Sequence, residues 1–187
     1  MDIIYKIDTY IFKLINISLS NYIFDLFMPI FHYTKYFIPI IILPWIITSI
    51  LDKKNRWKLI CLIPISIIFV DQTGLWIKQT IARPRPWVVM ESDLINHLVS
   101  QKGHYLSFPS NHAANTAVMA TIFSSIYYNF RYILWGSTII IMFSRVYIGV
   151  HYPLDVLFGF ILGLIFGKIL LYLWNYFESY INLKKLS

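Results

Sequence analysis

The hydrophobic pattern of the first twenty residues predicts an amphipathic helix. Apolar residues recur there at spacings of three and four, and the polar residues fall on the opposite side of a helical projection. The apolar set is Ile3, Ile4, Ile7, Ile11, Leu14 and Ile15, and the polar set is Asp2, Lys6, Thr9, Lys13 and Asn16. We therefore expect residues 1–20 to lie in a membrane interface, with a short first membrane span as the alternative.

Beyond this helix, long apolar stretches separated by short polar connectors predict a bundle of membrane-spanning helices. A span requires about 20 predominantly apolar residues, and five stretches approach that length. These stretches are residues 26–51, 57–80, 111–128, 132–148 and 153–176. The predicted fold is an all-α integral membrane bundle in a single domain over residues 1–187, with five spans, or six if the N-terminal helix also crosses. Asp71 and Gln72 interrupt the second stretch, so both are expected to face neighbouring helices.

The composition agrees with a membrane protein. Hydrophobic residues make up 58% of the chain and charged residues only 13%, whereas soluble domains contain about 25% charged residues. The net charge of +7 is scattered between apolar runs and forms no continuous basic stripe, so the sequence does not indicate a nucleic-acid partner. Cys61 is the one cysteine, which excludes an intramolecular disulfide.

The basic connectors predict how the bundle is oriented. With five spans, three basic segments fall on one side, which the positive-inside rule makes cytoplasmic. These segments contain Lys53, Lys54, Arg56 and Lys58, then Arg131, then Lys184 and Lys185. The polar loop over residues 81–108 and two further polar stretches, 109–112 and 144–155, then share the outer face. In the inner membrane of a bacterium, which the Ile-, Lys- and Asn-rich composition suggests, that face is periplasmic.

The stretch from Ser144 to Asp155 carries the strongest candidate chemistry. His151 and Asp155 are four residues apart and become neighbours if a helix begins at Pro153, a favoured first-turn residue. The carboxylate could then orient the imidazole and stabilise its charged form. The guanidinium of Arg145 matches the geometry of a phosphate.

The other two stretches supply complementary groups. Ser110 is a favourable N-cap, so a helix beginning there would direct free N–H groups at an anion, and His112 in its first turn could donate a proton. Lys78 and Arg85 add two positive charges, while Arg83 is equally compatible with a substrate contact and a surface charge. Together these groups suit phosphoryl transfer through a histidine. Two histidines and few carboxylates make a poor zinc or magnesium site, so no metal or other cofactor is expected.

These stretches resemble the three motifs of the type 2 phosphatidic acid phosphatases, the PAP2 superfamily of membrane lipid phosphatases. The family motifs K-x6-R-P, P-S-G-H and S-R-x5-H-x3-D correspond to Lys78 through Arg85-Pro86, Pro109-Ser110-Asn111-His112, and Ser144-Arg145 through His151 to Asp155. Asn111 stands where the family usually has Gly; it keeps the backbone N–H but adds a side chain near the pocket.

The resemblance implies a role for each motif residue. It makes His151 the nucleophile, Asp155 its orienting partner and His112 the general acid and then base. The phosphate would be bound by Lys78, Arg85, Ser110, Arg145 and the backbone N–H of Asn111.

The resemblance further implies metal-independent hydrolysis of a lipid phosphate or diphosphate through a phosphohistidine. Undecaprenyl diphosphate is the preferred substrate; lipid A 1-phosphate, phosphatidylglycerol phosphate and phosphatidic acid are alternatives. A lipid-phosphate binding or transport protein is the non-enzymatic alternative. The sequence makes no prediction about the oligomeric state. The remaining histidines, His32, His97 and His104, match no motif and are expected to be solvated or interfacial.

Overall fold

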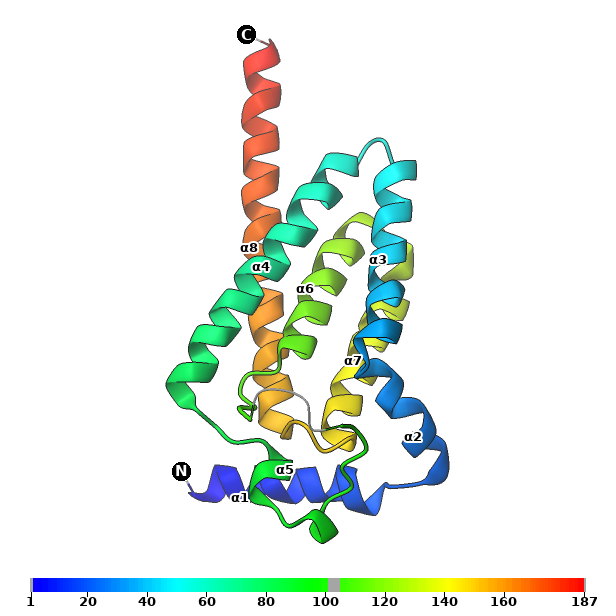
Figure 1. The fold of residues 1–187 in the computed structure, drawn as a ribbon. Helices are drawn as coiled ribbons and strands as arrows, with labels where there is room; N and C mark the ends of the chain where they lie inside the picture. Colours follow the sequence, from blue (N-terminus) through cyan, green and yellow to red (C-terminus); the bar gives the residue numbers. More distant parts are fainter. Residues whose placement is uncertain (1, 101–104, 187) are drawn as a thin grey trace.

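The computed structural model describes residues 2–100 and 105–186, and within these ranges the regular structure is helical (Figure 1). His104 lies outside the described residues. The main helices are α1 (Asp2–Lys13), α2 (Tyr22–Phe27), α3 (Thr34–Leu51), α4 (Arg56–Ile81), α5 (Pro86–Val89), α6 (Asn111–Ile126), α7 (Arg131–Tyr147) and α8 (Pro153–Leu186). Short π or 3-10 turns occupy Leu14–Ser18, Met28–Phe31, Ser92–Leu94 and Tyr128–Phe130.

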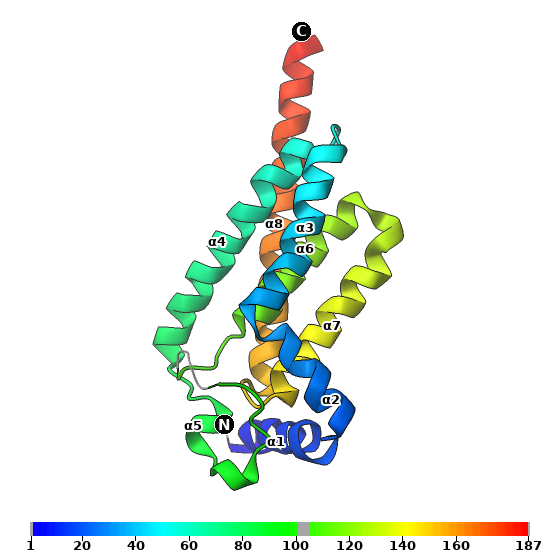
Figure 2. The same ribbon diagram turned by 45° about the vertical axis from the view of Figure 1, so that its right-hand side comes forward.

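Helix α1 lies across one end of the bundle rather than along it (Figures 1 and 2). Its apolar residues point away from the protein: Ile3 is 73% exposed and Ile7 53%. The side toward the protein is buried and includes Phe12 of α1 and Asn16 of the following π turn. We expected Asn16 on the polar outer face, which is wrong, because its amide donates to the backbone carbonyls of Asn96 at 2.8 Å and Tyr147 at 2.6 Å.

The first long apolar stretch does not form one helix over residues 26–51. Pro29 opens a 3-10 turn after α2, Tyr33 is extended, and α3 begins only at Thr34. The N-terminal helix and the segment Tyr22–Phe31 are bent by 98° relative to one another. A proline and an extended residue thus divide a segment whose apolar composition is continuous.

The other four helices begin within one residue of the predicted positions, and α8 extends ten residues beyond the predicted end of its span. Among the described helices, Arg56–Ile81 and Pro153–Asn182 are long and apolar enough to cross a membrane, and the bent N-terminal pair would make a third. Helices α6 and α7 have only 16 and 17 residues, shorter than a typical full span. The protein is therefore an integral membrane protein by its apolar helices, and the count of five spans stays a prediction.

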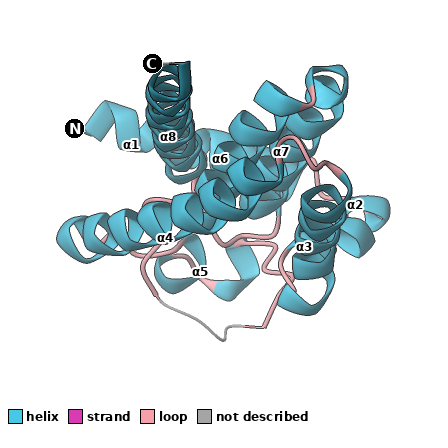
Figure 3. Cartoon of the chain, turned by 90° about the horizontal axis from the view of Figure 1, so that it is seen from above, coloured by secondary structure: helices cyan, strands magenta, loops and turns pink. Residues whose placement is uncertain are grey.

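Helix α6 is the centre of the bundle and packs against α8, α7 and α4 (Figure 3). Its contact with α8 depends on small residues at every fourth position of α8. A Cβ atom at Gly159 or Gly163 would overlap the backbone carbonyl of Ser110 or Ala114 on the α6 side. Such small residues let two membrane helices approach closely, and here they bring the beginnings of α6 and α8 together.

The three polar stretches lie at one end of the bundle, together with α1 and α5 (Figure 1). The α3–α4 connection and the C-terminus lie at the other end, and both carry the basic residues of the predicted connectors. The convergence of the polar stretches, predicted from the order of the helices, is therefore present in the fold.

Candidate functional site

The turn between α7 and α8 fixes His151 beside Arg145. Gly149 adopts a left-handed conformation with φ of 79°, which is accessible to glycine without steric penalty. The chain then reverses so that the N–H groups of Val150 and His151 donate to the carbonyl of Arg145 at 3.3 and 3.2 Å. Both Arg145 and His151 are buried.

Asp155 lies in the first turn of α8, which begins at Pro153 as predicted. One carboxylate oxygen accepts from Arg83 Nη1 at 2.7 Å, and the other accepts from the backbone N–H of Tyr152 at 2.8 Å. The second oxygen is 3.6 Å from His151 Nδ1, which is longer than a hydrogen bond. Asp155 therefore lies beside the imidazole and could bond to it after a shift of less than an ångström.

Ser110 occupies the N-cap position of α6, and its N–H donates to the backbone carbonyl of Asp155 at 2.9 Å. Ser110 is thus the N-cap as predicted, but its hydroxyl makes no hydrogen bond to the α6 N–H groups. His112 lies in the first turn of α6, half-buried and within electrostatic range of Arg145 and His151. The hydroxyl of Ser110 is thus available to a ligand rather than committed to the helix.

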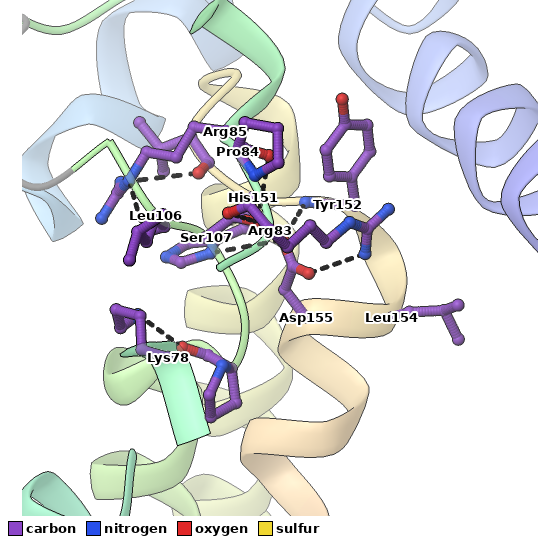
Figure 4. A network of polar contacts seen from close by, with 12 residues as sticks. Lys78, Arg83, Pro84, Arg85, Leu106, Ser107, His151, Tyr152, Leu154 and Asp155 are labelled. Atoms are coloured by element: carbon purple, nitrogen blue, oxygen red, sulfur yellow. Dashed lines mark hydrogen bonds and ion pairs between the residues drawn. The ribbon is translucent and has the colours of Figure 1, made fainter. Parts of the chain in front are cut away.

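Lys78 and Arg85 tie the first stretch to the other two (Figure 4). The ammonium group of Lys78 donates to the carbonyl of Pro109 at 2.8 Å. The guanidinium of Arg85 donates to the carbonyls of Leu106 at 3.2 Å and Val150 at 3.4 Å. All the residues predicted for the site therefore meet at this end of the bundle.

Several buried polar atoms of this cluster have no hydrogen-bond partner among the described residues. They are Ser110 Oγ, Arg145 Nε and Nη2, and His151 Nδ1. Leaving a buried donor unsatisfied costs about 1–3 kcal/mol, and more for a charged one, so such groups require a bound water, an ion or a role in a site. Lys78 and Arg85 lie near these atoms, so the cluster holds three cations including Arg145, which suits an anion. Burial and the charges of Arg85, Lys78 and Arg145 hold the pKa of the His151 imidazole well below its ordinary value.

Arg83 is not a surface charge, one of the two uses that the sequence left open. It is buried between the carboxylates of Asp8 and Asp155, at 2.5 and 2.7 Å. Sequence reasoning missed Asp8 altogether. The available signal was its spacing of four and eight residues from Phe12 and Asn16, which places all three on one helix face.

His32 also belongs to the site's surroundings, although it was expected to be solvated or interfacial. Its Nδ1 lies 3.4 Å from Arg145 Nη1, and burial next to Arg145 lowers the pKa of His32 to about 4. His97 instead stacks on Trp87, with 5.6 Å between ring centroids.

The side chain of Asn111 is held against α4. Its amide nitrogen donates to Asp71 at 2.9 Å, and Asn115 donates to the same carboxylate oxygen at 3.0 Å. Gly74 leaves room for this side chain, since a Cβ there would lie 3.0 Å from Asn111 Oδ1. Asp71 faces a neighbouring helix as predicted, but Gln72 is exposed, so that prediction was wrong.

The side chains of the site are poorly suited to bind a metal ion. Within residues 2–100 and 105–186, no group of three or more His, Cys, Asp or Glu side chains is arranged to hold an ion. The site's ligand-facing groups are cationic or neutral donors, which match an anion.

Comparison with known proteins identifies the family to which the chain is similar. The profile of the PAP2 superfamily matches residues 57–179. The chain is 26% identical to the lipid A 4′-phosphatase of Porphyromonas gingivalis over 72% of this chain and 63% of that protein. It is 29% identical to the undecaprenyl-diphosphatase of Sulfolobus acidocaldarius over 82% and 71% of the two chains. The chain thus spans slightly less than two thirds of the length of the lipid A 4′-phosphatase.

Two crystal structures share the fold. LpxE of Aquifex aeolicus superposes with a TM-score of 0.69 at 30% identity, covering 87% of this chain and 93% of that one. The PAP2-type phosphatidylglycerolphosphate phosphatase of Bacillus subtilis superposes with a TM-score of 0.72 at 22% identity, covering 97% and 89%.

Proposed function

The chain belongs to the PAP2 superfamily of phosphatases, and on that premise we propose that its buried cationic cluster hydrolyses a phosphate or diphosphate ester of a membrane lipid. The observation that carries this proposal is the set of unpaired buried donors on Ser110 and Arg145, beside His151. A phosphoryl group would satisfy these donors, and the adjacent cations would neutralise its oxygens, which is the main requirement of phosphoryl transfer.

The proposed reaction has two steps. His151 attacks phosphorus through Nε2, because Nδ1 faces Asp155, and the bond from phosphorus to the lipid or leaving phosphate oxygen breaks. His112 gives its proton to that oxygen. A water molecule, deprotonated by His112, then attacks phosphorus and breaks the bond to His151, which releases inorganic phosphate and the free imidazole.

The surrounding groups have complementary roles in this proposal. The low pKa of His151 keeps the imidazole neutral and nucleophilic at neutral pH. Asp155 stabilises the positive charge that the imidazole acquires as it takes the phosphoryl group. Lys78, Arg85, Arg145, Ser110 and the backbone N–H of Asn111 hold the phosphate oxygens.

An apolar groove supports a substrate with a hydrocarbon tail. It lies between α3, α6 and α7 and has a volume of about 300 Å³. Thr116 and Ile141 in its wall are each one helical turn from His112 and Arg145, so the groove begins at the edge of the phosphate site. A lipid tail could therefore remain among the helices while its phosphate reaches His151.

Undecaprenyl diphosphate is the first substrate we propose, and a phosphate of lipid A is the second. The relatives named above are an undecaprenyl-diphosphatase and a lipid A 4′-phosphatase, which supports both. We further propose that the site faces the periplasm of a bacterial inner membrane, since the basic connectors lie at the opposite end of the bundle.

Phosphate release by the detergent-purified protein in EDTA tests the reaction. The substrates are undecaprenyl diphosphate, lipid A, phosphatidylglycerol phosphate and phosphatidic acid. We expect release from at least one lipid, loss of release in His151→Ala, and wild-type release in the control His97→Gln. Full activity of His151→Ala would exclude the nucleophile, and no release from any lipid would favour a binding or transport protein.

A further inference from the structure

The N-terminal helix contributes a buried carboxylate to the surroundings of the site. Asp8 belongs to α1, which lies outside residues 57–179 matched by the family profile. Its exposed fraction is only 2%, on a helix whose apolar side chains are largely exposed. A buried carboxylate requires compensation by hydrogen bonds or an opposite charge.

Asp8 obtains this compensation from two groups next to His151 and Asp155, the proposed catalytic pair. Its Oδ2 accepts from Arg83 Nη2 at 2.5 Å, and its Oδ1 accepts from the backbone N–H of Leu154 at 2.8 Å. Arg83 uses its other terminal nitrogen for Asp155 at 2.7 Å. The guanidinium also lies 4.0 Å from the ring centroid of Tyr152 (Figure 4). Asp8 thus holds both the guanidinium that binds Asp155 and the helix turn that carries Asp155.

The charges in this chain of contacts determine how basic Asp155 is. One guanidinium is shared between two carboxylates, so the group of three has a net charge of −1. If Asp8 were neutral, Arg83 would neutralise Asp155 alone and the net charge would be zero. Asp155 would then stabilise a positive imidazole less effectively, because opposite charges in a buried site interact strongly.

Helix α1 also carries exposed apolar side chains that suit the surface of a bilayer. The side chains of Ile3, Ile4, Ile7 and Ile11 form an exposed apolar stripe on this helix, whereas Asp8 is buried. Such a stripe on a helix that lies across the end of the bundle fits the interfacial region of a membrane. The helix therefore has one face for lipid and one for the catalytic pair.

We propose that Asp8 is a positioning residue for the reaction, acting through Arg83 on Asp155, so that the membrane-seated helix α1 completes the catalytic pair. This inference rests on the proposed function. It assigns the N-terminal segment a part in the chemistry without direct contact with the substrate.

The test compares Asp8→Asn with the wild-type protein, using Asp93→Asn as a matched control. Asp93 is an exposed carboxylate, so its variant makes the same charge change away from the site. For Asp8→Asn we expect kcat to fall about tenfold, the effect of roughly one pKa unit on a charged imidazole. KM should change less than about twofold, because the phosphate-binding cations are untouched.

A pH profile separates this role from a general loss of packing. Without the charge of Asp8, the imidazolium of His151 is less stable, so the acid limb of kcat/KM should move to lower pH. The other charged or titratable groups that face His151 are unchanged in the variant. They are Lys78, Arg83, Arg85, His112, Arg145 and Asp155. A structural defect would lower the amount of active protein and leave the limb in place.

The experiment distinguishes failure of the role of Asp8 from failure of the proposed function. If the wild-type protein is active and folded Asp8→Asn has an unchanged kcat, the role of Asp8 is refuted and the proposed function stands. If the wild-type protein showed no activity, the proposed function itself would be refuted. If Asp8→Asn fails to fold, Arg83→Lys tests the same connection, because a lysine cannot bridge both carboxylates as a fork. It should show the same loss of kcat, and wild-type kcat in that variant would refute the role.

Discussion

Replacing Arg145 by Met should make the protein more stable and inactive at the same time. Arg145 is 1% exposed, and its Nε and Nη2 have no partner among the described residues, while its Nη1 lies 3.4 Å from His32 Nδ1. Each unsatisfied buried donor costs about 1–3 kcal/mol. Replacing buried charges by apolar residues of similar volume often stabilises by about 1–4 kcal/mol. Met retains an unbranched stem of similar shape, so little packing should be lost.

We therefore expect Arg145→Met to gain about 2 kcal/mol, which raises the unfolding midpoint by about 4–8 °C for a chain of this size. Phosphate release should fall at least about a hundredfold, because two charge-assisted hydrogen bonds to the phosphate are lost. The assay is thermal unfolding in detergent followed by tryptophan fluorescence, beside phosphate release from the preferred lipid.

Inorganic phosphate provides the internal control for this prediction. At 100 times its dissociation constant, a ligand stabilises the protein that binds it by about 2.7 kcal/mol. Phosphate should raise the midpoint of the wild-type protein and not that of Arg145→Met. A variant that is less stable than wild type, or one that is still stabilised by phosphate, would contradict the assignment of Arg145 as a buried phosphate ligand.

Two further predictions concern the imidazole and the second motif. Because burial and nearby cations lower the pKa of His151, the neutral imidazole persists on acidification, and the acid limb of kcat/KM should lie below the ordinary imidazole value of about 6.5. A pH–rate profile measures this, and an acid limb above that value would show that the free enzyme holds His151 in its charged form. Asp71→Ala should free the side chain of Asn111 to enter the phosphate site and raise KM about tenfold, the loss expected for one hydrogen bond to a charged group. Adding Asn111→Gly should restore KM in the double variant, and a persistent defect would show that Asp71 acts by another route.

The interruption before α3 shows that apolar composition does not predict where a helix begins and ends. Residues 26–51 are apolar enough to suggest one span, yet the helix is interrupted by the 3-10 turn Met28–Phe31 and by the extended residue Tyr33. This geometry places His32 against Arg145, 113 residues away. Hydrophobicity predicts that a segment is buried in lipid or protein, but it does not specify where the backbone turns within that environment.

The N-terminal helix shows a second limit. Its amphipathic period was visible in the sequence, and the apolar stripe is exposed as an interfacial helix requires. Asp8 and Asn16 nevertheless lie, with Phe12, on the buried side of this segment. A single helix pattern distinguishes apolar from polar residues, but it cannot distinguish polar residues in water from polar residues paired inside the protein.

The sequence by itself determined the class of protein, the beginnings of α4, α6, α7 and α8, and the residues that meet at the site. These features depend on local properties, namely apolar density, helix-starting residues and fixed motif spacing, and on the order of the helices, which sends all three polar stretches to one end. Only the tertiary structure decided which charges are paired. The bonds from Arg83 to Asp8 and Asp155 join residues 75 and 72 positions apart. Such pairing follows from the close packing of α8 on α6 and the placement of α1 across the bundle, because the free energy of a buried charge depends on what the whole fold places beside it.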